Sequence, residues 1–229
     1  LIIAIGTRLG FNSTFYSYDN ISKSAKIVQV DIDPIALGRY FPIELGINND
    51  AKKFLENLLT LLSLKKLKYN NSVWVNSFIN ERNNYYKQRD SQADVGSETI
   101  QPSGLFKELR DVMPKNSSVT LDAGTLCLQA TDQFNFAESK SLFTPLDFGL
   151  VGFSFAAGLG VKLAKPNSPV FSLMGDGGFG MTVSELSTAV QHNINTITIV
   201  MNNKSWGAEK AYQRDYYKKR YIGADISSP

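Results

Sequence analysis

The sequence contains few of the residues that carry out catalysis on their own. It has one cysteine, Cys127, and one histidine, His192, among 229 residues. A single cysteine excludes an internal disulfide framework and is typical of a reducing compartment, so we expect a cytoplasmic protein. One distant histidine leaves neither a Cys-His pair nor a zinc site within this chain. We therefore expect the chemistry to come from a cofactor, with His192 in a structural role at a helix end.

Long apolar runs and a large charge excess are also missing. No apolar stretch approaches the ~20 residues that span a bilayer, so no membrane segment is predicted. The formal net charge of +3 is too small to predict a nucleic-acid partner. Hydrophobic residues make up 43% and charged residues 20%, which are ordinary values for a chain that can build a core. The composition predicts a soluble α/β protein.

The chain begins without Met or the charged start of a signal peptide. Residue 1 is Leu, and residues 1–5 (LIIAI) already predict a buried strand. At the other end the sequence stops at Pro229, soon after its most informative motif. We therefore expect the 229 residues to be an internal fragment of a longer polypeptide.

The most informative stretch, residues 169–209, begins with a strand and a glycine turn. Residues 169–174 (PVFSLM) form a short apolar run that predicts a buried strand. The Gly-Asp-Gly-Gly sequence of residues 175–178 follows directly. Its glycines allow a sharp turn and a close approach of the backbone to a ligand.

A helix and a second strand complete this stretch. Thr182 followed by Glu185 predicts a capping box at a helix start, and the helix is expected to end near His192. Residues 196–201 (TITIVM) predict a strand that leads into Asn202-Asn203. A strand, helix and strand of this length form a right-handed parallel crossover, which brings the carboxyl ends of both strands to one edge.

Asp176 and Asn203 should therefore be neighbours in space. One carboxylate and one amide oxygen at a strand edge suit a hard divalent cation such as Mg²⁺, which keeps phosphate oxygens among its ligands. The glycine turn and the helix N-terminus offer N–H groups to the same phosphates. The alternative is that the two motifs are ordinary turns, since glycine-rich turns are common between helices and strands.

Gly-Asp-Gly-Gly followed by Asn-Asn at this spacing resembles the cofactor motif of thiamine diphosphate (ThDP) enzymes. Residues 101–229 resemble the cofactor-binding domain of the acetolactate synthase-like branch. The resemblance implies that Mg²⁺ is bound by Asp176, Asn203 and the main-chain carbonyl of Ser205. The cofactor-binding positions that it implies are Gly124, Thr125, Gly149, Val151, Gly175, Asp176, Gly177, Gly178, Asn203, Ser205, Trp206 and Gly207.

Some of these positions have specific roles in the family. The main-chain carbonyl at Gly149 would accept a hydrogen bond from the 4′-amino group of the cofactor, and the side chain at Val151 would wedge the cofactor into its bent conformation. Many relatives have a larger residue at the wedge position. Gly124 and Thr125 would contribute to the diphosphate pocket, although an ordinary turn between strand and helix explains them equally well.

The expected fold is α/β, with two doubly wound parallel-sheet domains. Residues 1–67 resemble part of the central domain of ThDP enzymes, residues 68–100 form a linker, and residues 101–229 form a C-terminally truncated domain that binds the diphosphate and Mg²⁺. Residues 50–67 predict an amphipathic helix that packs on the first sheet, and residues 73–86 another helix.

A nucleotide could also bind the central domain. Asp31 and Asp33 follow the strand predicted at residues 26–31, where an acidic residue can bind a ribose hydroxyl. The preceding turn, residues 6–10, does not have the GxGxxG pattern. In the resembled family this domain binds FAD or ADP in some members and nothing in others.

The resemblance implies a ThDP- and Mg²⁺-dependent transferase or lyase. It would cleave or join C–C bonds of a 2-oxo acid or related small carbonyl substrate through an enamine on the cofactor. Residues 206–210 (WGAEK) resemble sulfoacetaldehyde acetyltransferases, so that activity is an alternative to an acetolactate synthase-like reaction, as is an aldehyde lyase of the same branch. A non-catalytic nucleotide-binding or regulatory module of the same fold is the second alternative.

Glu209 is the candidate catalytic residue within the chain. It falls where decarboxylase-like relatives place an active-site glutamate, and it could donate or relay a proton. A surface ion pair with Lys210 or Arg214 is the competing interpretation. The glutamate that activates the cofactor comes from another domain of the family, so we expect the isolated chain to be inactive. The family also implies a homodimer or homotetramer.

Overall fold

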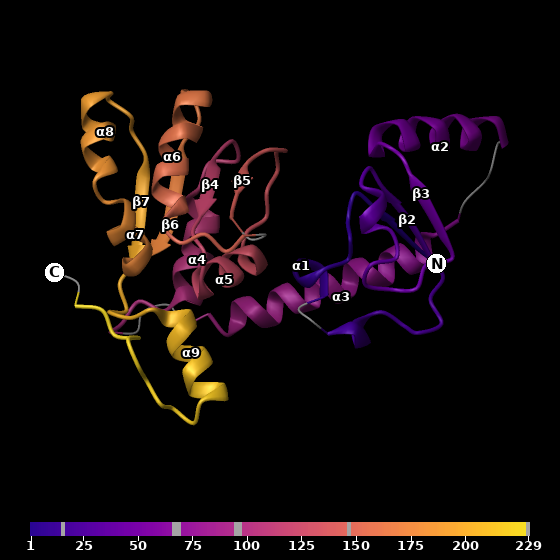
Figure 1. Ribbon diagram of the computed structural model, residues 1–229. Coiled ribbons are helices and arrows are strands. Elements are labelled where there is room, and N and C mark those ends of the chain that lie inside the picture. Colours follow the sequence, from indigo (N-terminus) through magenta and orange to yellow (C-terminus); the bar gives the residue numbers. More distant parts are fainter. Residues whose placement is uncertain (15–16, 66–69, 94–97, 146–147, 228–229) are drawn as a thin grey trace. The chain divides into compact units, whose positions relative to one another are not determined.

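The computed structural model describes residues 1–14, 17–65, 70–93, 98–145 and 148–227 (Figure 1). The chain divides into two compact units, Leu1–Phe78 and Ile79–Pro229. Each unit is built on a parallel sheet, which confirms the expected fold class. The expected domain boundary at residues 67 and 68 and residues 94–97 of the expected linker lie outside the described residues.

The first unit contains a three-stranded parallel sheet with the order β1-β2-β3. Its strands are β1 (Ile2–Ile5), β2 (Ile27–Asp31) and β3 (Leu45–Asn48). The other elements are the short helices α1 (Phe11–Thr14), η1 (Tyr18–Asn20) and η2 (Pro34–Ala36), then α2 (Ala51–Lys65) and the start of α3 (Ser72–Ser91). The strands predicted at residues 1–5 and 26–31 are confirmed as β1 and β2, whereas the short strand β3 was not predicted.

Burial in the first unit is lower than the sequence suggested. The apolar run at residues 1–5 was expected to be a buried strand, but only Ala4 is buried and Ile3 is 48% exposed. Among the described strands β2 alone pairs with β1, so β1 lies at the edge of this sheet and is less covered than a central strand. Helix α2 likewise contains no buried residue, and Leu59 on its apolar face is 63% exposed. The predicted packing of α2 is therefore only partial among the described residues.

The second unit contains a four-stranded parallel sheet with the order β5-β4-β6-β7. Its strands are β4 (Ser118–Leu121), β5 (Leu142–Phe143), β6 (Val170–Gly175) and β7 (Ile197–Met201). The helices are α4 (Pro102–Val112), α5 (Thr125–Gln133), α6 (Phe153–Ala164), α7 (Asp176–Thr182), α8 (Glu185–Gln191) and α9 (Gly207–Tyr216). Because the chain passes from β5 across to β6, the strand order reverses between β4 and β6.

Alternating side chains of β4 and β6 separate two cores. Leu121 and Leu173 are fully buried on the face covered by α4 and α5, where they pack with Phe106. Met174, the next residue of β6, lies on the opposite face with Phe155 of α6. The period of two in the strands thus distributes helices to both faces, as a doubly wound sheet requires.

Helix α6 lies close to the sheet across a polar contact. Thr120 Oγ1 donates to the main-chain oxygen of Ser154 at 2.9 Å and lies 3.0 Å from Ser172 Oγ, and all three residues are buried. Gly158 faces these hydroxyls, and a Cβ at Gly158 would lie 2.0 Å from Ser172 Oγ. The small residues that the sequence places in this helix therefore permit its close approach.

The region after β6 differs from the expected single helix. The Gly-Asp-Gly-Gly sequence does not form a turn before the helix, because α7 begins at Asp176 with Gly175 as its N-cap. The predicted capping box is also wrong: Thr182 ends α7, and Glu185 begins α8. Glu185 instead accepts a hydrogen bond from the hydroxyl of Thr188 at 2.8 Å. The helix was therefore predicted in the right place but with the wrong start.

Charged residues fasten the end of α3 to α4 and α5 within the second unit. Arg110 Nη2 lies 2.7 Å from Asp90 Oδ1, and Arg89 Nε lies 3.1 Å from the same oxygen. Burial raises the pKa of the Asp90 carboxyl, but the hydrogen bond from Arg89 and the charges of both arginines outweigh it, so the pKa is lowered overall. Tyr85 donates a hydrogen bond to Asp132, which raises the pKa of the Tyr85 hydroxyl.

Gly158→Ala tests the close packing of α6. The added methyl group would overlap Ser172 Oγ, and overpacking of this kind costs about 1–3 kcal/mol of unfolding free energy. Gly160→Ala is the matched control in the same helix, because nothing lies within 4 Å of its Cβ position. It should be neutral or stabilising by up to about 1 kcal/mol. Equal denaturant midpoints for the two variants would contradict the packing.

Asp90→Asn tests the charged cluster by its pH dependence. A lowered pKa in the folded state means that Asp90 stabilises the fold above its unfolded pKa of about 4. This stabilisation disappears as the pH falls through the folded-state pKa. Because Asp90 is partly exposed, we expect a loss of at most about 1 kcal/mol at pH 7. Thermal unfolding should show this difference narrowing toward pH 3, and a constant difference would argue against the ion pairs.

Candidate functional site

The carboxyl ends of β4, β6 and β7 form one edge of the second sheet. Leu121 pairs with Leu173, and Gly175 pairs with Met201, so the three strands end side by side. The strand order reverses between β4 and β6, and ligands of doubly wound sheets bind at such a point. Figure 1 shows α7 starting at the end of β6, with α9 beyond this end of the sheet.

Asp176 and Asn203 lie at this edge, as the sequence predicted. Asp176 is the first residue of α7, follows β6 directly and is 8% exposed. Asn203 follows β7 by two residues and is exposed. Because Gly175 and Met201 are register partners on adjacent strands, both side chains start from neighbouring strand ends.

Two glycines bring the remaining candidate residues together. A Cβ at Gly177 would lie 2.6 Å from the Trp206 ring, so the start of α7 packs directly on the segment after β7. A Cβ at Gly207 would lie 2.9 Å from Asn203 Nδ2 and 3.5 Å from Thr125 Oγ1. The first turns of α5, α7 and α9 therefore meet, which joins candidates from three separate parts of the sequence.

Asn203 and Ser205 form a local turn. Asn203 Oδ1 accepts hydrogen bonds from the main-chain N–H of Ser205 at 3.0 Å and from its hydroxyl at 3.1 Å. Ser205 also faces Asp225 in an isolated antiparallel bridge. The bonds of this bridge are Trp206 N–H to Ala224 O and Ile226 N–H to Lys204 O. They leave the peptide groups of Ser205 facing away from Asp225, as in a non-hydrogen-bonded pair.

The loop that contains Gly149 and Val151 reaches the same edge. Gly149 has φ +71° and Gly124 has φ +111°, a region that favours glycine, and nothing lies within 4 Å of a Cβ at either position. Val151 is partly buried and precedes Gly152, whose Cβ position is 3.1 Å from Met181 Cβ. The loop thus lies against α7, and both glycines border open space.

The donors at this edge suit a hard cation. No group of three or more His, Cys, Asp and Glu side chains that could hold a metal occurs among the described residues. The candidate set consists instead of one carboxylate, one amide and one main-chain carbonyl, all of them oxygen donors. Oxygen donors fit Mg²⁺, which fills its other positions with water and phosphate oxygens. To bind the ion, Asn203 Oδ1 would have to coordinate it in addition to, or in place of, accepting the two hydrogen bonds from Ser205.

Glu209 lies in the first turn of α9 and is exposed. The competing ion pairs do not form among the described residues, because Lys210 pairs with Asp225 and Arg214 pairs with Asp215. Glu209 therefore remains the candidate proton donor, three residues after the Trp206 that packs on Gly177.

The single cysteine and the two acidic residues of the first unit have local roles. Cys127 is buried, its Sγ lies 3.1 Å from Thr144 Oγ1, and burial raises the pKa of the thiol. Such a thiol is a poor nucleophile. Asp31 Oδ1 accepts from Asp33 N–H, and Asp33 Oδ1 accepts from Ile35 N–H to cap η2. These turns explain both carboxylates without a nucleotide.

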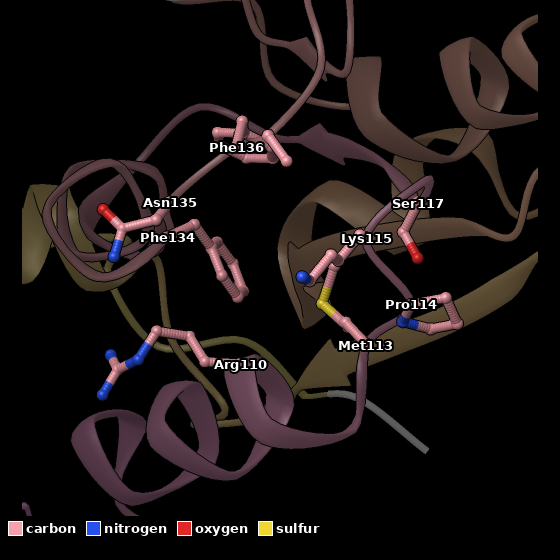
Figure 2. A pocket seen from close by; sticks show the side chains of 9 residues that line it. Arg110, Met113, Pro114, Lys115, Ser117, Phe134, Asn135 and Phe136 are labelled. Carbon is pink, nitrogen blue, oxygen red and sulfur yellow. The ribbon is translucent and has the colours of Figure 1, made fainter.

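A cavity of about 210 Å³ lies elsewhere in the second unit (Figure 2). Figure 2 shows Phe134 reaching into it from one side and Lys115 from the other. Ser117 lines it just before β4 begins, at the opposite strand end from Asp122. The cavity is therefore separate from the candidate site.

Sequence reasoning missed Asp122, the residue that follows β4. It is 2% exposed, and its carboxylate accepts from the main-chain N–H groups of Gly152 and Phe153 at 3.0 and 2.7 Å. The available signal was an acidic residue two positions before Gly124, at the turn between a strand and a helix. Nothing in the sequence indicated that its partners lie thirty residues downstream.

Comparison with known proteins agrees with this geometry. Residues 122–229 match the thiamine pyrophosphate enzyme C-terminal TPP binding domain, and residues 1–58 match the thiamine pyrophosphate enzyme central domain. Thiamine pyrophosphate is another name for ThDP. The chain therefore belongs to the thiamine pyrophosphate enzymes and carries their central and C-terminal cofactor-binding domains.

Individual relatives come from two groups of enzymes. Sulfoacetaldehyde acetyltransferase of Alcaligenes xylosoxydans xylosoxydans is 30% identical over 251 residues, covering 100% of this chain and 42% of the relative. The acetolactate synthase large subunit of Haemophilus influenzae is 31% identical over 231 residues, covering 100% of this chain and 39% of the relative. The chain thus spans about two fifths of the length of these relatives. Among the described residues, no helix has the length and apolar character needed to cross a membrane.

Gly177→Ala tests the contact between α7 and Trp206. The new methyl group would lie within 3 Å of three ring atoms, so the indole must move. In a Trp74→Phe background, Trp206 is the remaining tryptophan, and its emission should shift to longer wavelength as it becomes more exposed. Gly180→Ala is the control in the same helix, since nothing lies within 4 Å of that Cβ position. An unchanged spectrum for Gly177→Ala would contradict the contact.

Proposed function

We propose that this chain binds ThDP through Mg²⁺ and takes part in cleaving or joining C–C bonds of a small carbonyl substrate such as a 2-oxo acid. The observation that carries the proposal is the placement of Asp176 and Asn203 at the ends of adjacent parallel strands, beside the reversal of strand order. The match of residues 122–229 to the TPP binding domain supports the choice of cofactor.

Asp176, Asn203 and the Ser205 carbonyl would hold the metal. Their oxygens are the hard ligands that Mg²⁺ prefers, and the metal would in turn bind the diphosphate. Gly175, Gly177, Gly178 and Gly207 would line the diphosphate site. Two of these glycines have direct structural reasons, because a Cβ at Gly177 or Gly178 would collide with Trp206 or Asp122. Glycine at these two positions allows the start of α7 to pack against Trp206 and Asp122, which positions the main chain that would approach the diphosphate.

The organic part of the cofactor would lie along the loop before α6. Gly149 would present its main-chain carbonyl to the aminopyrimidine, Val151 would support the bent conformation, and Gly124 and Thr125 would border the diphosphate. When bound, ThDP supplies carbanion chemistry that amino-acid side chains lack. Glu209, exposed at the start of α9, would donate or relay a proton at this edge.

The candidate reactions are closely related and differ in their substrates. The sequence of residues 206–210 favours a sulfoacetaldehyde acetyltransferase, whereas the resemblance of residues 101–229 as a whole favours an acetolactate synthase-like reaction. An aldehyde lyase of the same branch is a further alternative. Relatives of both names are about 30% identical to the chain. A homodimer or homotetramer in the cytoplasm, without nucleic-acid or membrane partners, completes the proposal. A non-catalytic module remains the rival, as does FAD or ADP binding by the first unit.

Ligand-dependent thermal unfolding of the full-length protein tests the cofactor. A ligand that binds only the folded form stabilises it by about 2.7 kcal/mol at one hundred times its dissociation constant. We expect ThDP with Mg²⁺ to raise the thermal midpoint, with little effect of either alone, and Asp176→Ala to abolish the rise. Asp31→Asn is the matched control, a carboxylate at a strand end of the other sheet, and should respond like the native protein.

The outcomes separate the rival functions. Absence of any shift in the native protein would favour a non-catalytic module, and a shift with FAD or ADP that Asp31→Asn weakens would place a nucleotide in the first unit. A shift that survives Asp176→Ala would contradict the metal site. With the cofactor established, product analysis with pyruvate and with sulfoacetaldehyde would distinguish the two reactions.

A further inference from the structure

Asp122 is a buried carboxylate outside the proposed metal set. It is 2% exposed and directly follows β4, at the edge where the candidate residues meet. Its Oδ1 accepts from Phe153 N–H at 2.7 Å and from Ser154 N–H at 3.3 Å, and its Oδ2 accepts from Gly152 N–H at 3.0 Å. One side chain therefore satisfies three successive main-chain donors from a segment thirty residues away.

These donors are the first N–H groups of α6. Gly152 is the N-cap with φ +84°, and no side chain of the helix itself caps this end. The exposed N–H groups and dipole of a helix start attract an anion. In α6 the carboxylate of Asp122 already fills that position. The α6 terminus is thus closed to a phosphate, and the diphosphate must use other N–H groups at this edge.

The same carboxylate also lies against the start of α7. A Cβ at Gly178 would lie only 1.8 Å from Asp122 Oδ2, and the Gly178 Cβ position is 3.7 Å from Gly152 N. Gly152 in turn lies against Met181 and Thr182 of α7. Asp122 therefore occupies the junction of three segments: the end of β4, the loop before α6, and the first turn of α7.

We propose that Asp122 is a positioning residue for the cofactor, holding the segment 149–152 at a set distance from the segment 176–178. This inference rests on the proposed function, because the first segment would receive the aminopyrimidine and the second the diphosphate. Asp122 acts through the main-chain N–H groups of Gly152, Phe153 and Ser154. A rigid distance between the two segments keeps the cofactor in a single bent conformation.

The role requires a carboxylate. An aspartate offers two acceptor oxygens, which match N–H groups from Gly152 on one oxygen and from Phe153 and Ser154 on the other. An asparagine has one acceptor, and its NH₂ group would face another donor. Asp122→Asn keeps the shape of the side chain but loses at least one of these bonds, so the loop before α6 is released while β4 and α7 remain.

The test compares two ligands on the full-length Asp122→Asn protein. Dissociation constants are measured by calorimetry for ThDP and for inorganic diphosphate, both with Mg²⁺. We expect the constant for ThDP to rise about 10- to 100-fold, by analogy with the replacement of residues that orient the ligands of a metal ion. The constant for diphosphate should change less than about threefold, because Asp176, Asn203 and the glycines that line that site are untouched.

Leu121→Ala is the matched control for general destabilisation. Leu121 precedes Asp122 in the chain, is fully buried and lies in the core on the α4 and α5 face. Its truncation should lower the thermal midpoint while leaving the ratio of the two dissociation constants unchanged. An equal change of this ratio in Leu121→Ala, or no change in Asp122→Asn, would overturn the positioning role. Failure of the native protein to bind ThDP would instead overturn the proposed function.

Hydrogen exchange in the native protein gives a second test that needs no variant. If Asp122 couples the two segments, diphosphate with Mg²⁺, which would occupy only the segment 176–178, should slow amide exchange in peptides covering residues 148–154 at least about threefold. Unchanged exchange in these peptides, together with slowed exchange in peptides covering residues 176–178, would show that the two segments are not coupled, and the proposal would fail. This measurement decides the matter even if Asp122→Asn does not fold.

Discussion

Strand β6 is the constraint on which the second unit depends. It pairs with β4 on one side and β7 on the other, and its first five residues are buried. These pairings bring Asp122, Asp176 and Asn203 to one edge, although they are far apart in the sequence. Because the side chains of a strand alternate, successive residues of β6 also pack with helices on opposite faces of the sheet. The site is therefore a consequence of strand register.

Close backbone packing is the second requirement, and glycine supplies it. Gly158 lets α6 approach the hydroxyls of Thr120 and Ser172, Gly177 lets α7 approach Trp206, and Gly178 leaves room for Asp122. A methyl group at any of these positions would overlap an existing atom. Gly177 and Gly178, which the sequence suggested were part of a turn, are thus packing residues within α7.

The buried carboxylate of Asp122 is matched to main-chain donors at this edge. Asp122 takes three N–H groups at the start of α6, and Asn203 closes a turn with Ser205. A buried carboxylate is costly unless such bonds compensate it, so the arrangement restrains the loop geometry strongly. The oxygen donors that remain near the edge suit a hard cation. This agrees with the membership of the chain in the thiamine pyrophosphate enzymes.

The sequence by itself determined the strands at residues 170–175 and 197–201, the presence of helix between them, and the placement of Asp176 and Asn203 at one edge of the sheet. Apolar runs and spacing are local properties, and a parallel crossover has one hand, so these features follow without coordinates. The start of α7, the partial exposure of β1 and α2, and the partners of Asp122 were decided only by the tertiary structure. Each depends on which distant segment lies alongside, since a carboxylate at a strand end looks the same whether it binds a metal or three N–H groups of another helix.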